Sequence, residues 1–469
     1  MINARLRPVL DEIRPLAELF GAAERRIYLV GGIVRDLLDG REIARPDFDL
    51  TTDARPDETK RIIGSWADAV WTQGERFGTI GAKRGDRVYE ITTHRAEAYH
   101  ADSRKPDVVY ADAIEADLAR RDFTVNAMAL SLPEPELIDP YDGRNDLLVE
   151  RRLRTPLSAA ESFDDDPLRM LRAARFIAGY GLTPDDELVA TARELRHRLE
   201  IVSAERIRDE LDKLLLVADP TPGLWYLYDT GLFELFVPEV AAMRLEQDPI
   251  HRHKDVLTHT FAVVANVAAR KPDGTPNSVT RLAALLHDVG KPKTRSIGPN
   301  GVSFHHHEVV GARMARERMA ALRYPTDVVD EVSRLVFLHL RFHGYDEGEG
   351  GWTDSAVRRY VRDAGPLLTE LNELTRCDCT TRNERKARLL ARRMDALETR
   401  IERLAEEEEL RAIRPDLDGN AVMGILGVGP GRVVGEALSF LLELRLDEGP
   451  IGAAEAERRL RDWYAARPG

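Results

Sequence analysis

The hydrophobic pattern of this chain changes its period once, and that change constrains the fold more than any other feature. Up to residue 155, short segments have the composition and alternation of strands, at Arg26–Val30, Asp47–Thr51 and Arg87–Thr92. From Asp164 to the C-terminus, apolar residues recur instead at helical spacing. We therefore expect a small mixed sheet with helices first and an all-helical remainder after it.

The length and composition fit a multidomain protein. A chain of 469 residues, 43% hydrophobic and 32% charged, can bury several cores. It contains no run of 18 apolar residues, and its N-terminal segment mixes charged residues into apolar positions, unlike a signal peptide. The net charge of −13 leaves room for local basic grooves. We expect a soluble, cytoplasmic protein with no membrane partner.

A glycine turn and three carboxylates indicate phosphoryl-type chemistry. Gly31 and Gly32 stand between a predicted strand and a predicted helix, where backbone N–H groups can approach a phosphate. Asp47 and Asp49 are two apart on a strand, so both side chains point to one face and can bind one Mg²⁺. Glu90, on a nearby predicted strand, supplies a third carboxylate. Three such groups can hold two metal ions around a phosphoryl-transfer site, although an isolated Asp-x-Asp pair is more often a polar edge strand.

Four motifs resemble one family in their order along the chain. Leu29–Leu38 followed by Asp47–Asp49 resembles the head domain of the class II tRNA nucleotidyltransferase and bacterial poly(A) polymerase family. Arg120–Met128 resembles its ribose- and triphosphate-binding motif, and Asp164–Arg172 resembles its base-reading motif. Ser203–Leu211 resembles the helix that follows in the family. The fold implied is a nucleotidyltransferase head followed by a helical neck.

The resemblance implies a role for each matched side chain. Asp47 and Asp49 would bind Mg²⁺ and, with Glu90, form the catalytic group. The implied nucleotide-binding residues are Gly31, Gly32, Arg35, Arg121, Asp122, Asp166, Arg169, Arg172 and Arg175. Among these, the glycines with Arg35 and Arg121 would hold the triphosphate, and Asp122 would contact the ribose.

The base-reading motif can also be argued from chemistry. Asp166 and Arg169 are three apart on a predicted helix and so share a face. An ionised Asp only accepts hydrogen bonds and Arg only donates them, which matches the amino group and ring nitrogen of cytosine or adenine. Uracil and guanine would place a carbonyl oxygen against the carboxylate and be rejected. The simpler alternative is an ordinary intrahelical ion pair.

Histidine use marks a second module, since nine of the 12 histidines lie between His251 and His343. Their spacing resembles the HD phosphohydrolase superfamily, which implies a divalent transition metal such as Mn, Ni, Co, Fe or Zn. The implied core ligands are His259, His287, Asp288 and Asp378, with His307 and His339 at positions where some members bind a second metal. Four other histidines of this region have no assignment and are expected at the surface, namely His251, His253, His305 and His306. The alternative is a degenerate domain kept for packing and RNA contact.

These observations predict four consecutive domains: a nucleotidyltransferase head (1–155), a helical nucleotide-reading neck (156–248), an HD-like metal-binding domain (249–390) and a C-terminal helical RNA-binding region (391–469). The resemblance implies a template-independent enzyme that adds CCA to tRNA 3′ ends from CTP and ATP and releases pyrophosphate. Phosphate contacts to tRNA are expected from arginines near the head–neck junction and beyond residue 390, namely Arg152, Arg169, Arg172, Arg175, Arg392, Arg393 and Arg400.

Several alternatives stay open at this stage. A poly(A) polymerase, or an enzyme that adds only CC or only A, would carry the same motifs. Asp139–Leu147 resembles a family motif tied to the switch from C to A addition, but its trailing arginines stand one residue further on than usual. An HD phosphohydrolase with an inactive head and a non-enzymatic RNA-binding module are the other classes. The oligomeric state is not indicated by the sequence.

Overall fold

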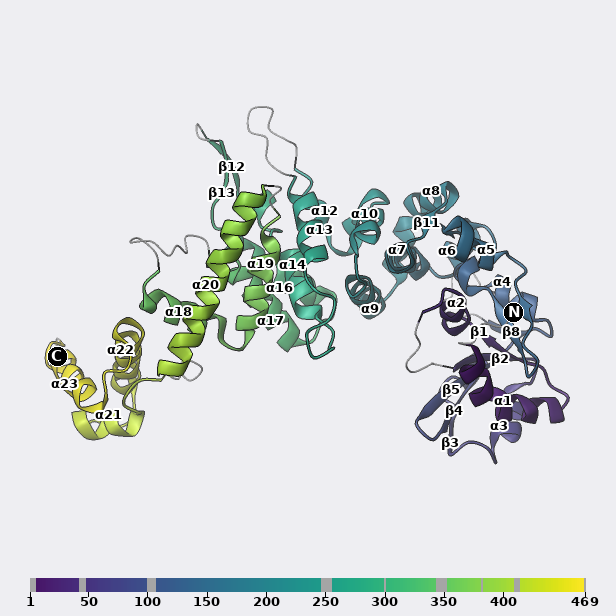
Figure 1. Cartoon of the computed structure of the whole chain (residues 1–469), viewed down its shortest axis with the longest axis horizontal. Coiled ribbons are helices and arrows are strands. Elements are labelled where there is room, and N and C mark those ends of the chain that lie inside the picture. Colours follow the sequence, from purple (N-terminus) through teal and green to yellow (C-terminus); the bar gives the residue numbers. More distant parts are fainter. Residues whose placement is uncertain are drawn as a thin grey trace. The chain divides into compact units, whose positions relative to one another are not determined.

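A computed structural model describes residues 6–41, 48–98, 107–245, 255–298, 301–342, 352–380, 383–408 and 414–467. The chain divides into two compact units, Met1–Phe236 and Val237–Gly469, and each is described by itself. In Figure 1 the first unit runs from purple to teal and the second from teal to yellow. Among the helices that these residues form, none is both long and apolar enough to cross a membrane.

A seven-stranded mixed sheet forms the base of the first unit, with strand order β3-β4-β5-β2-β1-β8-β9. The strands are β1 (Ile27–Val30), β2 (Phe48–Thr52), β3 (Ala69–Trp71), β4 (Thr79–Arg84), β5 (Arg87–Thr93), β8 (Ala129–Leu132) and β9 (Leu137–Ile138). Strands β2 and β5 are parallel, whereas β1 pairs antiparallel with both β2 and β8. A separate hairpin is formed by β6 (Arg95–Ala98) and β7 (Asp107–Tyr110). The three strands predicted from the sequence are therefore confirmed as β1, β2 and β5.

Helices surround this sheet and continue beyond it. Those near the sheet are α1 (Leu6–Ala22), α2 (Gly32–Leu38), α3 (Pro56–Ile63) and α4 (Ile114–Ala119). Those that follow are α6 (Ala159–Asp165), α7 (Leu168–Tyr180), α8 (Asp186–Leu195), α9 (Ala204–Leu215), α10 (Thr221–Asp229) and α11 (Phe233–Phe236). Helix α7 packs against α9 and α10, and a Cβ at Gly223 of α10 would lie 2.4 Å from the carbonyl oxygen of Ala174. Only glycine allows this close approach.

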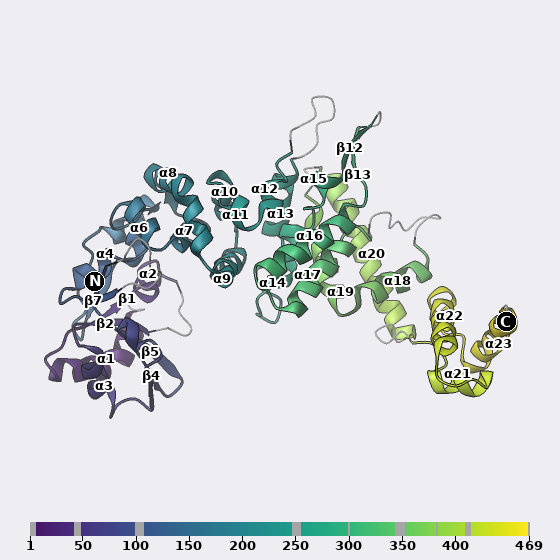
Figure 2. The same cartoon turned by 180° about the vertical axis from the view of Figure 1, so that it is seen from behind.

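The second unit is mostly helical, as predicted (Figure 2), and it also contains one hairpin that was not predicted. Its helices are α12 (Pro238–Ala241), α13 (Val256–Asn266), α14 (Ser278–Leu286), α15 (Lys291–Thr294), α16 (His307–Ala321), α17 (Thr326–Leu338), α18 (Asp354–Ala364), α19 (Leu368–Asp378), α20 (Glu384–Glu408), α21 (Gly419–Leu426), α22 (Arg432–Glu448) and α23 (Ala453–Ala465). The hairpin consists of β12 (Arg295–Gly298) and β13 (Gly301–Phe304). Helices α21 to α23 share a small core around Val422, Leu441 and Leu460.

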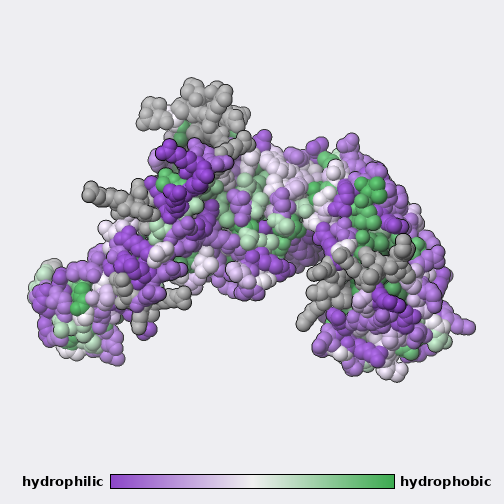
Figure 3. All heavy atoms as spheres, in the orientation of Figure 1, coloured by the Kyte–Doolittle hydropathy of each residue, from purple (hydrophilic) through white to green (hydrophobic). Residues whose placement is uncertain are grey.

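One glycine positions the metal-ligand candidates of the second unit. Gly290 follows the His287–Asp288 pair, and a Cβ there would lie only 2.1 Å from the carbonyl oxygen of His307. The turn after α14 therefore lies directly against the first residue of α16. On the face drawn in Figure 3, hydrophilic residues predominate and hydrophobic ones form small patches, because the larger apolar side chains pack inside the units.

Candidate active site and candidate metal centre

The first unit contains an open hollow of about 330 Å³ beside strands β2 and β5. Most of the residues predicted to act on the nucleotide line it: Asp49, Glu90, Arg121, Asp122, Asp166, Arg169 and Arg172. Further charged residues, to which the sequence analysis gave no role, line it as well: Arg95, Asp117, Arg120 and Arg206. The hollow therefore combines carboxylates with guanidinium groups, as the binding of a metal-bound triphosphate requires.

The catalytic carboxylates predicted from the sequence lie on adjacent strands. Asp49 of β2 is in register with Glu90 of β5, and neighbouring side chains in a parallel pair point to the same face. Both are exposed and line the hollow. Asp47, the other predicted metal ligand, lies outside the described residues. The two carboxylates fit a Mg²⁺ ion, which prefers a few oxygen ligands together with substrate phosphates.

The glycine turn lies directly against these groups. Gly31 has a φ of +76°, and a Cβ there would lie 3.4 Å from Asp49 Oδ2 and 3.2 Å from Arg121 Nη1. A side chain at this position would be strained and would occupy the space between the carboxylate and the arginine. Gly32 begins α2, and its Cβ would lie 3.3 Å from Arg35 Nη2. The backbone therefore closes one side of the candidate phosphate site.

Asp117 is a site residue that the sequence analysis missed. Its buried carboxylate forms ion pairs with Arg120 at 3.0 Å and with Arg121 at 3.1 Å. Burial alone would raise the pKa of Asp117, but the charges of Arg121 and Arg120 outweigh it and lower the pKa to about 2. The ionised carboxylate thereby holds Arg121 over the glycine turn. The sequence did contain a signal for these ion pairs, because Asp117 precedes the two arginines by three and four residues, the spacing of ion pairs on a helix.

The carboxylate of Asp122 is bound by other groups of the protein. One carboxylate oxygen accepts hydrogen bonds from the Phe123 N–H at 2.9 Å and from Asn126 Nδ2 at 2.8 Å. The other oxygen lies 2.5 Å from Arg172 Nη2, which joins the head to α7. Burial would raise the pKa of Asp122, yet Arg172 and the hydrogen bonds hold it well below its usual range. The ribose contact implied by the resemblance stays a prediction.

Two other arginines implied to bind the nucleotide do not line the hollow. Arg35 is buried, donates from Nη1 to Asn126 Oδ1 at 2.6 Å, and lies 4.2 Å from the centre of the Tyr180 ring. It therefore ties α2 to α7. Arg175 forms an ion pair with Glu210 at 2.9 Å and ties α7 to α9. Their family-implied roles stay predictions.

The base-reading pair is arranged differently from the prediction. Helix α6 ends at Asp165 and α7 begins at Leu168, so Asp166 precedes the helix instead of sharing a face with Arg169. The reason is Pro167, because the residue before a proline is disfavoured in the helical conformation. Asp166 Oδ1 accepts the Leu168 N–H at 3.2 Å, and Oδ2 accepts from Arg206 Nη2 at 2.9 Å. Both residues of the pair nevertheless line the hollow.

The segment that resembled the C-to-A switch motif is packed against the head. Asp146 is fully buried, accepts the Thr124 hydroxyl at 2.7 Å, and forms ion pairs with Arg152 at 3.0 Å and Arg154 at 2.8 Å. A π-turn at Asp146–Glu150 precedes these arginines. A π-turn accommodates one more residue than an α-turn, so the displaced arginines still reach the carboxylate.

Some arginines predicted to contact tRNA are already paired within the protein. Arg152 and Arg172 form the ion pairs described above. Arg400 of α20 contacts Asp354 at 2.7 Å and donates to the carbonyl of Trp352 at 2.6 Å. Arg392 is exposed on the same helix, and Arg393 lines a cavity of the second unit. Their proposed contacts with tRNA remain predictions.

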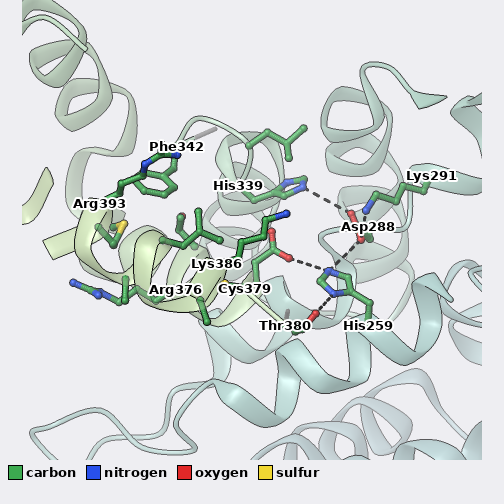
Figure 4. Close-up of a pocket in the computed structure, with 17 residues that line it drawn as sticks. His259, Asp288, Lys291, His339, Phe342, Arg376, Cys379, Thr380, Lys386 and Arg393 are labelled. Carbon is green, nitrogen blue, oxygen red and sulfur yellow. Dashed lines mark hydrogen bonds and ion pairs between the residues drawn. The ribbon is translucent and has the colours of Figure 1, made fainter. Parts of the chain in front are cut away.

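The second unit brings together all six metal ligands implied by the HD resemblance. They come from the ends or faces of five helices: His259 from α13, His287 and Asp288 after α14, His307 from α16, His339 after α17 and Asp378 from α19. The Nε2 atom of His259 lies 2.9 Å from Asp378, and the Nε2 atoms of His287 and His307 lie 3.2 and 3.3 Å from Asp288. Figure 4 shows part of this cluster at the wall of a cavity of about 600 Å³.

Each of the four histidine rings is oriented by a hydrogen-bond partner of its Nδ1 atom. The Nδ1 atoms of His287, His307 and His339 lie 2.8, 2.8 and 2.6 Å from the carbonyl oxygen three residues earlier. His259 Nδ1 lies 2.7 Å from the Thr380 hydroxyl. A proton on Nδ1 that donates outward leaves the Nε2 lone pair facing inward, which is the arrangement of metal-binding histidines.

The electrostatics of the cluster favour a cation. Burial would raise the pKa of Asp288, but His287, His307 and Lys291 hold it well below its usual value. Burial and the nearby His287 lower the pKa of His339 to about 3, so its imidazole is neutral. Two overlapping triads share Asp288 and have their ligand atoms within 4.8 Å of one another: His259, His287 and Asp288, and Asp288, His307 and His339. The donor set fits one or two divalent transition metal ions.

Buried polar atoms in the cluster strengthen this fit. Among the described residues, Nε2 of His287, His307 and His339 and Oδ1 of Asp288 are buried and make no regular hydrogen bond. Such groups are costly unless an ion or water satisfies them. His305 and His306 are exposed, as predicted, whereas His251 and His253 lie outside the described residues.

Comparison with known proteins agrees with the predicted order of the modules. Three family descriptions match successive parts of the chain: "Poly A polymerase head domain" over residues 27–154, "Probable RNA and SrmB- binding site of polymerase A" over residues 181–244 and "HD domain" over residues 256–404. The CCA-adding enzyme of Bacillus stearothermophilus, solved in complex with CTP, has the same fold, with a TM-score of 0.67 at 22% identity over 99% of each chain.

Two relatives match almost the whole length. The A-adding tRNA nucleotidyltransferase of Deinococcus radiodurans is 34% identical over 474 residues, 99% of each chain. The CC-adding tRNA nucleotidyltransferase of Thermus thermophilus is 32% identical over 454 residues, 94% of each chain. These similarities confirm the resemblance that the motifs indicated: the chain belongs to the tRNA nucleotidyltransferase family.

Proposed function

We propose that the protein is a template-independent tRNA nucleotidyltransferase that adds C, C and A to the 3′ end of tRNA from CTP and ATP. The observation that carries the proposal is one hollow in which Asp49 lies against the Gly31 turn and beside Glu90, and which Arg121 and Asp166 also line. The tRNA 3′-hydroxyl attacks the α-phosphate of the bound nucleotide, and pyrophosphate leaves. A cytoplasmic location stays a prediction that agrees with a function in tRNA processing.

Different residues of the chain would bind the metal ion, the triphosphate and the base. Asp49 and Glu90, with Asp47, would hold Mg²⁺, which neutralises charge on the transferred phosphate and its leaving group. Arg121, fixed by Asp117, would bind the triphosphate against the backbone of the glycine turn. Asp166 would accept a hydrogen bond from the exocyclic amino group, which cytosine and adenine both carry.

A second candidate is addition of A alone or of CC alone. The observation that favours it is that two relatives which match nearly the whole length are named for A addition and for CC addition. The carboxylate of Asp166 suits either base and does not separate these functions.

The test uses purified protein, Mg²⁺ and three tRNA transcripts that lack CCA, end in CC or are complete. CTP and ATP are supplied singly and together, and the products are sized to one nucleotide. Three additions in the order C, C, A support the proposal. A stop after CC, or addition of A only to the transcript ending in CC, identifies a specialised enzyme, and a long run of A identifies a poly(A) polymerase.

We also propose that the HD centre binds a divalent transition metal and hydrolyses a phosphoester. The proposal is supported by four imidazole Nε2 atoms that converge on Asp288 and Asp378 beside an open cavity. Metal analysis of the purified protein and hydrolysis of p-nitrophenyl phosphate and bis(p-nitrophenyl) phosphate with Mn²⁺, Ni²⁺ or Co²⁺ test it. A protein that binds none of these ions would contradict it.

A further inference from the structure

The cavity beside the metal-ligand candidates of the second unit extends from those ligands to helix α20. On one side its lining includes His259, Asp288, His339 and Asp378. On the other side six residues of α20 line it: Lys386, Ala387, Leu390, Ala391, Arg393 and Met394. Figure 4 shows the Lys386 side chain extending from α20 toward the side of the cavity on which His259 and His339 lie. A phosphate group bound at the metal centre would therefore have α20 as its neighbour.

The face that α20 turns toward the cavity is divided into a cationic edge and an apolar strip. At about 3.6 residues per turn, Lys386 and Arg393 lie two turns apart on one edge of this face. Leu390 and Met394 lie beside that edge, and the buried Phe342 adds to the apolar lining. A ligand in the cavity therefore meets positive charge next to apolar side chains, which suits a phosphate joined to an apolar group.

Two other cations of the cavity are already paired within the protein. Lys291 Nζ lies 2.6 Å from Asp288 Oδ2, and Arg376 Nη2 lies 2.6 Å from Glu398 Oε2. Lys386 differs from them, because it is exposed and its ammonium group makes no hydrogen bond or ion pair within the described part of the chain. The ammonium group can therefore bind an anion without breaking an existing interaction.

The stability of α20 does not explain a lysine at this position. Arg385 and Lys386 lie in the first turn of the helix, where the helix dipole disfavours positive charge. In the next turn, Arg388 is compensated by an ion pair with Glu384 at 3.2 Å. Among the residues that the structure describes, none compensates Lys386 in this way. A bound anion would supply the missing negative charge.

We infer that Lys386 binds the phosphate of the substrate at the HD centre and makes this centre prefer phosphomonoester dianions to phosphodiester monoanions. The inference rests on the proposed phosphoester hydrolysis and names the substrate class of that centre. The Coulomb attraction to one cation is proportional to the charge of the ligand, so a dianion gains about twice as much from Lys386 as a monoanion in the same position. The apolar strip of α20 would contact the group to which the phosphate is joined.

The test measures ligand affinity separately from turnover. Protein loaded with Mn²⁺ is titrated in a calorimeter at about pH 8 with phenylphosphonate, a dianion without an ester bond, and with its monomethyl ester, a monoanion. The variants are Lys386→Met, Lys386→Arg and the control Arg388→Met. Arg388 is two residues along α20, on its opposite side, so the control removes the same charge outside the cavity. The Mn²⁺ affinity of each variant and its hydrolysis of p-nitrophenyl phosphate and bis(p-nitrophenyl) phosphate are measured in parallel.

We expect Lys386→Met to weaken the binding of phenylphosphonate about tenfold and that of the monomethyl ester only about threefold, because half the Coulomb energy gives the square root of the ratio. The KM for p-nitrophenyl phosphate should rise by a similar factor of about ten. Lys386→Arg keeps the charge and should restore most of the binding, Arg388→Met should match the wild type, and the Mn²⁺ affinity should stay unchanged in all variants.

Three results would overturn the inference. They are wild-type protein that binds the monomethyl ester as tightly as the dianion, equal effects of Lys386→Met on the two phosphonates, and a loss of Mn²⁺ affinity in Lys386→Met. Wild-type protein that hydrolyses neither p-nitrophenyl ester would contradict the proposed hydrolysis instead. That result is separate, because the binding of a phosphonate does not depend on turnover.

Discussion

At the scale of single residues, Asp117 connects the stability of the head to its chemistry. It is buried, carries a charge, and fixes the arginine that lies over the glycine turn. Removing the Asp117 carboxylate leaves the charges of Arg120 and Arg121 without a nearby opposite charge. Asp117→Asn should therefore lower the free energy of unfolding by about 3 kcal/mol at neutral pH. Urea unfolding measures this, with Asp462→Asn, in an exposed pair with Arg458, as the control that stays near wild type.

The same carboxylate predicts the pH dependence. The pKa of Asp117 is lowered from 3.8 to about 2. Its contribution to the free energy of unfolding is therefore present above pH 4 and is lost as the pH falls toward 2. The difference in unfolding free energy between wild type and Asp117→Asn should be constant from pH 5 to 8 and shrink by about 2 kcal/mol below pH 4. A difference that grows on acidification would contradict this assignment.

A substitution at Gly31 can distinguish the effect of backbone strain on stability from a direct effect on nucleotide addition. Gly31→Ala puts a side chain at φ +76° and fills the space between Asp49 and Arg121. Gly85→Ala is a matched control, because Gly85 has a φ of +57° with nothing near its Cβ position. Both variants should lose about 1–2 kcal/mol of stability, but only Gly31→Ala should lose nucleotide addition, by about 100-fold or more. Equal activity losses in the two variants would show that Gly31 acts through stability alone.

At the scale of elements, the sequence predicted the strands that carry the site better than the helix ends. A short apolar run before the glycines predicted β1 and alternation predicted β2 and β5, while the structure shows that Asp49 is in register with Glu90. Periodicity did not show that Pro167 breaks the helix at Asp166, although the proline was visible. The partners of Arg35, Asp122 and Arg206 depend on how α7 and α9 pack, and local pattern carries no information about long-range pairs.

The close contact of Gly290 with α16 gives a prediction at this scale. Gly290→Ala would place a Cβ 2.1 Å from the His307 carbonyl, so α16 must move away from Asp288. We expect a stability loss of about 1–3 kcal/mol and at least tenfold weaker binding of Mn²⁺ or Ni²⁺. Calorimetric titration measures both affinities, and Gly298→Ala, at a position with open space, should bind as wild type does.

At the scale of the whole molecule, each of the two compact units contains one candidate site, and the two sites differ in their chemistry. The order of the modules followed from the change in hydrophobic period and from the histidine distribution, and the matched family descriptions follow the same order. Asp288→Asn should therefore abolish metal binding in the second unit and leave nucleotide addition intact. Loss of both activities in this variant would show that the centres depend on one another.

The most direct test of the central claim is nucleotide addition by wild type and Asp49→Asn under identical conditions. Asp49 lies exposed beside Glu90 and the glycine turn, so the substitution changes charge with little effect on the core. With tRNA lacking CCA, CTP, ATP and Mg²⁺, wild type should extend the 3′ end, and Asp49→Asn should be slower by about 1,000-fold. Extension by Asp49→Asn at the wild-type rate would contradict the assignment of the hollow as the active site.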